Sequence, residues 1–144
     1  MKNTMILKKS FEFKAPASTV WDALTRPELI KKYFFGTDTE TDWKKGSPIF
    51  FRGTWEGKSY EDKGTILDIV PQKLIQYSYW SSFSGTEDIP ENYANITYEL
   101  APAKDGTTLT ITQDGIESKE KLDHSEVNWT QVMEGMRKLV ETAS

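Results

Sequence analysis

His124 is the only histidine in this chain of 144 residues, which has no cysteine. Asp123 and Ser125 flank it, so an acid, a base and a hydroxyl group meet in one short segment. Because Ser125 is the immediate neighbour of His124, the spacing implies no nucleophile–base geometry. We expect an exposed, solvated His124. One histidine without cysteine also argues against a zinc site, and we expect neither a metal nor a cofactor.

Acidic pairs stand at positions 61–62 and 87–88, but neighbours in a strand point to opposite faces and neighbours in a loop are solvated. Asp62 and Asp68 share strand parity with Ile66 and could therefore reach an internal cavity. Burial there would raise the pKa of a carboxyl group and make it a candidate general base. The sequence has no Walker-type loop and no dinucleotide fingerprint. We therefore predict no catalytic residues and favour a protein that is not an enzyme.

Aromatic and apolar residues offer a different chemistry, the binding of an apolar small molecule. Tyrosine hydroxyl and tryptophan N–H groups can orient a ligand in a cavity, and methionines can form an adaptable wall. The candidate ligand-binding residues are Tyr77, Tyr79, Ile96, Tyr98, Leu109, Ile111, Trp129, Met133 and Met136. The alternative for each of these side chains is ordinary packing in a core.

The last third of the chain supplies elements that would position these residues. Residues 95–100 and 108–112 alternate apolar and polar side chains, which predicts two strands. Gly106 follows Lys104 and Asp105 between them and predicts a hairpin, because glycine accepts the positive φ of a tight turn.

A long amphipathic helix is predicted to follow the hairpin, because apolar residues recur at helical spacing from Trp129 to Ala143. Asp123 and Glu126 resemble a capping box, so we expect this helix to begin near Asp123. The recurring apolar residues form a wide stripe along the helix. Such a stripe must pack on an apolar surface, which the preceding strands supply.

The rest of the chain predicts more strands and two short helices. The expected elements are a strand over 5–14, helices starting at Pro16 and Pro27, a loop over 36–47, strands from 49, over 60–70 and over 74–80, a turn at 56–57 and a loop over 81–92. Lys9 interrupts the apolar side of the first strand, which favours an edge strand or a bend. We predict a single α+β domain over 1–144, with a curved antiparallel sheet of about six strands around the C-terminal helix and two short helices after the first strand.

Composition excludes several function classes. The net charge is −4, the pI is about 5.1, and lysine and arginine are scattered, so nucleic acid is not an expected partner. No stretch approaches the ~18 apolar residues of a membrane span. The apolar run at 5–7 is too short for a signal peptide. Together with the absence of cysteine, these features favour a cytoplasmic protein, and we expect a monomer or weak dimer.

Four segments together resemble a known family. They are Val20-Trp21-Asp22-Ala23-Leu24-Thr25-Arg26-Pro27-Glu28-Leu29, Gly64-Thr65-Ile66-Leu67-Asp68-Ile69-Val70-Pro71, Ile96-Thr97-Tyr98-Glu99-Leu100 with Asp105-Gly106-Thr107-Thr108-Leu109-Thr110-Ile111-Thr112, and Trp129. In order and spacing, the chain resembles the START-like helix-grip superfamily, in the branch similar to the activator of the ninety-kilodalton heat-shock-protein ATPase. The family usually has glycine before this tryptophan, whereas this chain has Asn128.

The resemblance implies a deep cavity between the sheet and the C-terminal helix, used in the superfamily for apolar or amphipathic small molecules. It leaves three hypotheses for function. The first is a binding module for a small hydrophobic or aromatic molecule. The second is a chaperone-associated interaction protein with a role in the stress response, as the family name suggests. The third is a cofactor-free cyclase or hydrolase.

Overall fold

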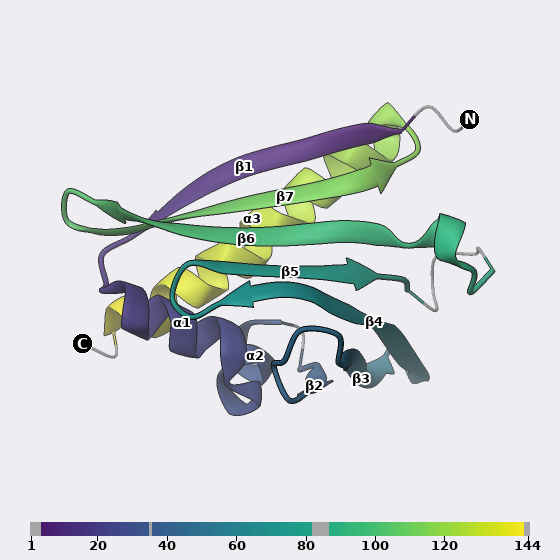
Figure 1. Ribbon diagram of the computed structural model, residues 1–144, viewed down its shortest axis with the longest axis horizontal. Helices are drawn as coiled ribbons and strands as arrows, with labels where there is room; N and C mark the ends of the chain where they lie inside the picture. The colour runs from purple at the N-terminus through teal and green to yellow at the C-terminus, as the bar shows by residue number, and fades with distance from the viewer. Residues whose placement is uncertain (1–3, 35, 82–86, 143–144) are drawn as a thin grey trace.

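One antiparallel sheet grips a long C-terminal helix in the computed structural model, which describes residues 4–34, 36–81 and 87–142 (Figure 1). The elements are β1 (Met5–Phe13), α1 (Ala17–Thr25), α2 (Pro27–Tyr33), β2 (Asp38–Glu40), β3 (Pro48–Trp55), β4 (Lys58–Val70), β5 (Leu74–Tyr79), the short 3-10 helix η1 (Pro90–Asn92), β6 (Ala94–Ala103), β7 (Gly106–Ile116) and α3 (Lys119–Thr142). The sheet order is β1-β7-β6-β5-β4-β3-β2. The predicted α+β helix-grip class is confirmed.

The sheet has one strand more than predicted. The additional strand, β2, pairs Thr39 with Phe51 of β3, inside the segment expected to be a loop. Its sequence Asp38-Thr39-Glu40 holds no apolar residue, so hydrophobic alternation could not reveal it. The predicted loop over 81–92 holds η1, and its residues 82–86 lie outside the described residues.

The two hairpins use glycine for different reasons. The β3–β4 turn has positive φ at Glu56 and Gly57, 50° and 80°, as a tight two-residue turn requires. In the β6–β7 hairpin, Gly106 lies in the strand and does not have positive φ. The hairpin was predicted correctly, but the predicted positive φ at Gly106 is wrong. A Cβ atom there would lie 2.0 Å from the Phe13 carbonyl oxygen of β1, and this close approach is what excludes larger residues.

Helix α3 begins at Lys119, four residues earlier than predicted. The Ser118 hydroxyl caps it by accepting the backbone N–H of Lys121 at 3.2 Å. The capping-box prediction is wrong, because Asp123 lies inside the helix and its carboxylate accepts from Lys119 Nζ at 3.1 Å. Ala143, the last residue of the predicted apolar stripe, lies outside the described residues.

The core lies between the inward face of the sheet and the apolar face of α3, and α1 and α2 lie at the C-terminal end of that helix (Figure 1). Residues from distant parts of the chain meet there with almost no exposed surface, among them Phe13, Val20, Leu109, Ile111, Met133 and Met136. The burial of these apolar side chains is the main force that holds α3 on the sheet.

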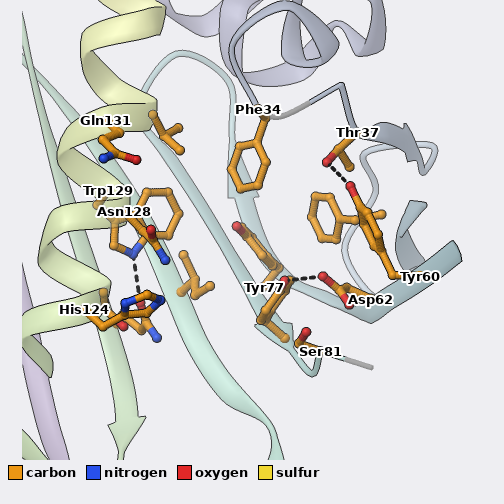
Figure 2. A pocket seen from close by; sticks show the side chains of 16 residues that line it. Phe34, Thr37, Tyr60, Asp62, Tyr77, Ser81, His124, Asn128, Trp129 and Gln131 are labelled. Carbon is orange, nitrogen blue, oxygen red and sulfur yellow. Dashed lines mark hydrogen bonds between the residues drawn. The ribbon is translucent and has the colours of Figure 1, made fainter. Parts of the chain in front are cut away.

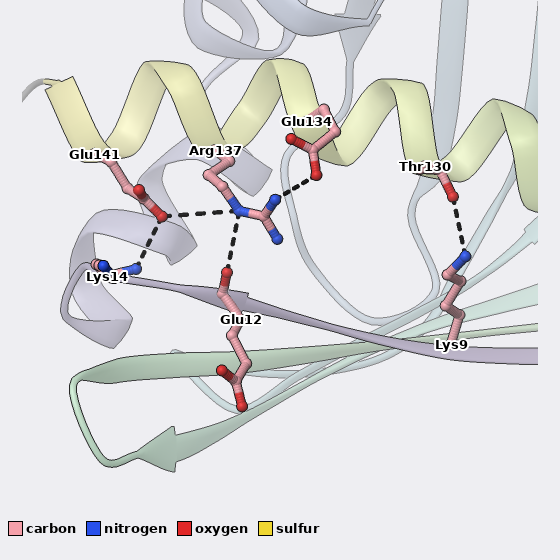
Figure 3. Close-up of polar contacts among 7 residues, drawn as sticks. All are labelled: Lys9, Glu12, Lys14, Thr130, Glu134, Arg137 and Glu141. Atoms are coloured by element: carbon pink, nitrogen blue, oxygen red, sulfur yellow. Dashed lines mark hydrogen bonds and ion pairs between the residues drawn. The ribbon is translucent and has the colours of Figure 1, made fainter.

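Polar contacts fix α3 along the edge strand β1 (Figure 3). Arg137 donates to the Glu12 carbonyl oxygen at 3.3 Å, and Glu141 accepts the Lys14 backbone N–H at 3.1 Å. Lys9 Nζ donates to Thr130 Oγ1 at 3.2 Å. β1 stands at the end of the strand order, so the edge-strand prediction is confirmed. Lys9, which interrupts the apolar side of this strand, forms its hydrogen bond with α3.

Candidate functional site

A cavity of about 650 Å³ lies between the first half of α3 and strands β3, β4 and β5 (Figure 2). The helix contributes one wall, formed by His124, Ser125, Asn128, Trp129, Gln131 and Val132. The sheet and the segment after α2 form the other walls, with Phe34, Thr37, Phe51, Tyr60, Asp62, Tyr77, Tyr79, Ser81, Ile96 and Gln113. Because strands alternate their side chains, residues of one parity reach this space: Tyr60 and Asp62 of β4, and Tyr77 and Tyr79 of β5.

Four of the nine candidate ligand-binding residues line this cavity: Tyr77, Tyr79, Ile96 and Trp129. The other five do not. Tyr98, Leu109, Ile111, Met133 and Met136 are buried in the core, farther along the same interior. They face the same interior as the cavity residues, but apolar side chains fill the space around them.

Several cavity residues were not among the candidates. Phe51 lies on the inward face of β3, as Ile49 does, and it pairs with Asp62 of β4 across the ladder. Strand parity was the available signal for it, since Ile49 and Phe51 alternate. Phe34 follows the last residue of α2, where its backbone N–H bonds to the Ile30 carbonyl oxygen, and no periodicity in the sequence indicated it.

Aromatic rings connect the two sides of the cavity. Phe34 stacks on Phe51 with ring centroids 6.4 Å apart and meets Trp129 edge-on at 6.3 Å. Phe51 also contacts Tyr77 at 5.8 Å and Tyr79 at 5.7 Å. Ring pairs at these distances and angles add stability beyond the area that they bury. The walls are thus apolar ring surfaces held in fixed positions.

Polar atoms of the same walls are joined in pairs. Tyr79 donates its hydroxyl to Asp62 Oδ2 at 2.6 Å, and Trp129 Nε1–H donates to Gln113 Oε1 at 2.8 Å (Figure 2). Asp62 is only 8% exposed. The hydrogen bond from Tyr79 satisfies part of the acceptor capacity of this buried carboxylate.

A second pair of hydroxyl groups lies at the boundary between cavity and core. Tyr77 and Tyr98 share a buried hydrogen bond of 2.8 Å between their hydroxyl oxygens. Desolvation by burial raises the pKa of both hydroxyl groups above the ordinary value, because an ionised phenolate would lose its hydration. Desolvation also raises the pKa of Tyr79, and the neighbouring Asp62 carboxylate adds to that effect.

Of the two acids predicted to reach a cavity, Asp62 does and Asp68 does not. A β-bulge lies between Ile66 and Asp68, so Ile69 takes the inward position opposite Ile75. Asp68 is thereby shifted to the other face, and its side chain accepts the N–H of Ile69 at 3.0 Å. Within the described residues, no group of three or more metal-ligating side chains could hold a metal ion.

His124 is exposed, as expected, yet it also lines the cavity. Figure 2 shows it on the helix wall below Asn128, across the cavity from Asp62 and Tyr60. Asn128, the residue found where the family usually has glycine, points its amide toward the same space. His124 and Gln131 of α3 are exposed, so solvent reaches this side of the cavity wall.

Sheet, grip helix and internal cavity together define a START-like, or Bet v1-like, helix-grip domain. Residues 14–141 match the model of the Activator of Hsp90 ATPase homolog 1-like protein family, and the chain belongs to that family. The resemblance found in the sequence is therefore confirmed.

Solved structures agree with this assignment. The chain is 43% identical to ChR145 from Cytophaga hutchinsonii, with a TM-score of 0.86, covering 99% of this chain and 98% of that one. SA2116 from Staphylococcus aureus, described as a protein of unknown function, is 18% identical with a TM-score of 0.82, covering 98% and 96%. Ara h 8.0201 is 12% identical with a TM-score of 0.77, covering 97% and 99%, and shares the fold alone.

A search of curated proteins found no match. No helix among the described residues is long and apolar enough to cross a membrane.

Proposed function

We propose that this protein binds a small hydrophobic or aromatic molecule in the cavity between its sheet and α3. The observation that supports this most directly is the cavity of about 650 Å³ with aromatic walls. Ligand sites in proteins typically enclose roughly 300–1,000 Å³ and combine apolar walls with a few polar groups. A core built only for stability would be packed without such a void.

The polar groups on the walls would orient the ligand. Trp129 offers a broad ring, and its N–H is held by Gln113. Tyr79 is held by Asp62 through a short hydrogen bond. Groups held in this way lose little conformational entropy when a ligand binds, which favours affinity.

The two other hypotheses have less support. An interaction with a heat-shock chaperone rests on the family description alone. A cyclase or hydrolase would need a general base in the cavity. Asp62 is the one carboxylate among the described lining residues, and no second acid is present among them to share acid–base work. The cytoplasmic location and the monomeric or weakly dimeric state remain predictions from the sequence.

The proposal can be tested by titrating the protein with fatty acids, flavonoids and aromatic dyes while following the tryptophan indole N–H signals by NMR. Trp129 is the only tryptophan among the described lining residues, so its signal should shift first. Trp21, Trp43 and Trp80 serve as internal controls, because they do not line the cavity.

A matched pair of variants makes the test specific. Ser125→Trp would fill the cavity from the helix wall, whereas Glu126→Trp places the same side chain at the neighbouring exposed position. Binding should be lost in the first variant and retained in the second. The proposal fails if no compound binds with a Kd below about 1 mM, roughly −4 kcal/mol. It also fails if both variants bind equally well.

A further inference from the structure

The charge of the cavity lining is one-sided. Among the described residues that line it, Asp62 is the one acidic residue, and none is lysine or arginine. The nearest basic residue on the same strand, Lys63, has the opposite parity and forms an ion pair with Asp88 at 2.5 Å. His124 is exposed on the facing wall, where solvent screens its interactions.

Aromatic rings lie directly beside this carboxylate. Phe51 pairs with Asp62 across the β3–β4 ladder, and the Tyr79 hydroxyl donates to it at 2.6 Å. The rings of Phe51 and Tyr79 are 5.7 Å apart. Aromatic faces attract cations through their quadrupole, and this attraction grows when the cation is removed from water. A carboxylate among rings is therefore a favourable place for an ammonium group.

An anionic ligand would meet the opposite situation. Its carboxylate would lose hydration on entering, and no lysine or arginine of the described lining would compensate that loss. It would also be repelled by Asp62, which is 8% exposed and little screened by water. Fatty acids and other organic anions are thus disfavoured by the same groups that favour an amine.

We propose that the cavity selects a ligand that joins an aromatic or other apolar body to a protonated amine, with the amine placed beside Asp62, Phe51 and Tyr79. This inference rests on the proposed function, since it assigns a chemical class to the ligand of the same cavity. The apolar body would occupy the space between Trp129 of α3 and Ile96 of β6, which is separated from the strand of Asp62 by β5.

Three matched compounds test the inference: naphthylethylamine, naphthylethanol and naphthylacetate, which share one ring system and carry positive, zero and negative charge at pH 7. Isothermal titration calorimetry should show the amine binding at least about tenfold more tightly than the acid, with the alcohol in between. In Asp62→Asn, which keeps an acceptor for Tyr79, the preference for the amine should disappear.

Glu61→Gln is the control, because it removes the same charge from the next residue of β4. Glu61 is exposed, pairs with Arg52 at 2.6 Å and does not line the cavity, so this variant should keep the preference. If Asp62→Asn does not fold, the order of the three compounds on the unmodified protein still decides the matter.

The outcomes separate the two proposals. Equal affinity for all three compounds, or tightest binding of the acid, overturns the amine inference and leaves the proposed function standing. Loss of the amine preference in Glu61→Gln as well would assign it to net charge and overturn the role of Asp62. No measurable binding of any compound overturns both proposals.

Discussion

The two halves of α3 lie on the same sheet but enclose different interiors. From Met133 to Val140 the inward positions of the helix are apolar and buried, and Met133 is only 1% exposed. Before Met133 the helix presents Ser125, Asn128, Trp129 and Val132 to a cavity of about 650 Å³. One end of the interior is a packed core, and the other is a space lined by aromatic rings.

The comparison shows that the fold alone does not create the cavity. The side chains that α3 presents differ between the two regions: Ser125 and Asn128 stand beside Trp129 at the cavity, whereas Met133 and Met136 are buried in the core. The shape of this cavity therefore depends on which side chains α3 presents, and the fold alone does not fix a function.

The largest expected effect is that of high pH on the tyrosines at the boundary of the two regions. The pKa values of Tyr77, Tyr79 and Tyr98 are raised in the folded protein above the value of 10 in the unfolded chain. Their contribution to stability is thus fully present below pH 10 and is lost as the pH rises above it, because the unfolded state then releases protons first. We expect tyrosine absorbance near 295 nm and circular dichroism to change together during an alkaline titration.

The half-buried Tyr93 gives an internal reference in the same titration. Desolvation and a hydrogen bond to Asp88 raise its pKa to about 12. If the buried tyrosines ionised at pH 10 while the circular dichroism of the fold stayed unchanged, the described burial of their hydroxyl groups would be incorrect.

A large effect is also expected in the packed region. Met133→Ala should lower the free energy of unfolding by about 2–5 kcal/mol, because it leaves a hole in a well-packed core. Urea denaturation measures this loss. Ligand binding should be unchanged in conditions where the variant is folded, since Met133 does not line the cavity. A loss below about 1 kcal/mol would mean that the core at this end is not tightly packed.

An intermediate effect is expected at the boundary. Tyr77→Phe removes one member of the buried hydroxyl pair and leaves the Tyr98 hydroxyl without that partner. This should cost about 1–3 kcal/mol of unfolding free energy. The double variant Tyr77→Phe/Tyr98→Phe should recover part of the loss, since no buried polar group is then left unpaired. Additive losses in the double-mutant cycle would show that the two hydroxyl groups do not interact.

The smallest effect is expected at the cavity end of the helix. Ser125→Ala should change stability by less than about 0.5 kcal/mol, because Ser125 packs against open space and alanine has the higher helix propensity. Met133→Ala on the same helix is the matched truncation in the packed core, so the losses of unfolding free energy in the two variants can be compared. Equal losses from the two truncations in urea melts would remove the distinction between core and cavity.

The fold could be predicted from the sequence where periodicity is strong. The β6–β7 hairpin and α3 both follow from alternation and helical spacing. The start of α3 could not be predicted in this way. The capping residue Ser118 is followed three residues later by Lys121 and not by the glutamate or glutamine of a capping box, whereas Asp123 and Glu126 match that pattern by coincidence. β2 was missed because it carries no apolar residue.

The cavity could be predicted only in part. Strand parity indicates which side chains face inward, and it correctly places Tyr77, Tyr79 and Ile96 on the interior side of the sheet. Parity does not show which part of the interior is filled, so it does not separate the core residues Leu109 and Ile111 from the residues that line the cavity. Asp68 was misplaced because a β-bulge reverses parity after Ile66, and no residue pattern indicated that bulge.

The most direct test of ligand binding in the cavity is to map nuclear Overhauser contacts between a bound naphthyl compound and the protein. We predict contacts from the ligand ring to the Trp129 indole, the Tyr77 ring and the Ile96 methyl groups, all of which line the cavity. No contact is expected to the methyl group of Met133 in the core. Contacts confined to Trp43 or Trp80, outside the cavity lining, would contradict the account.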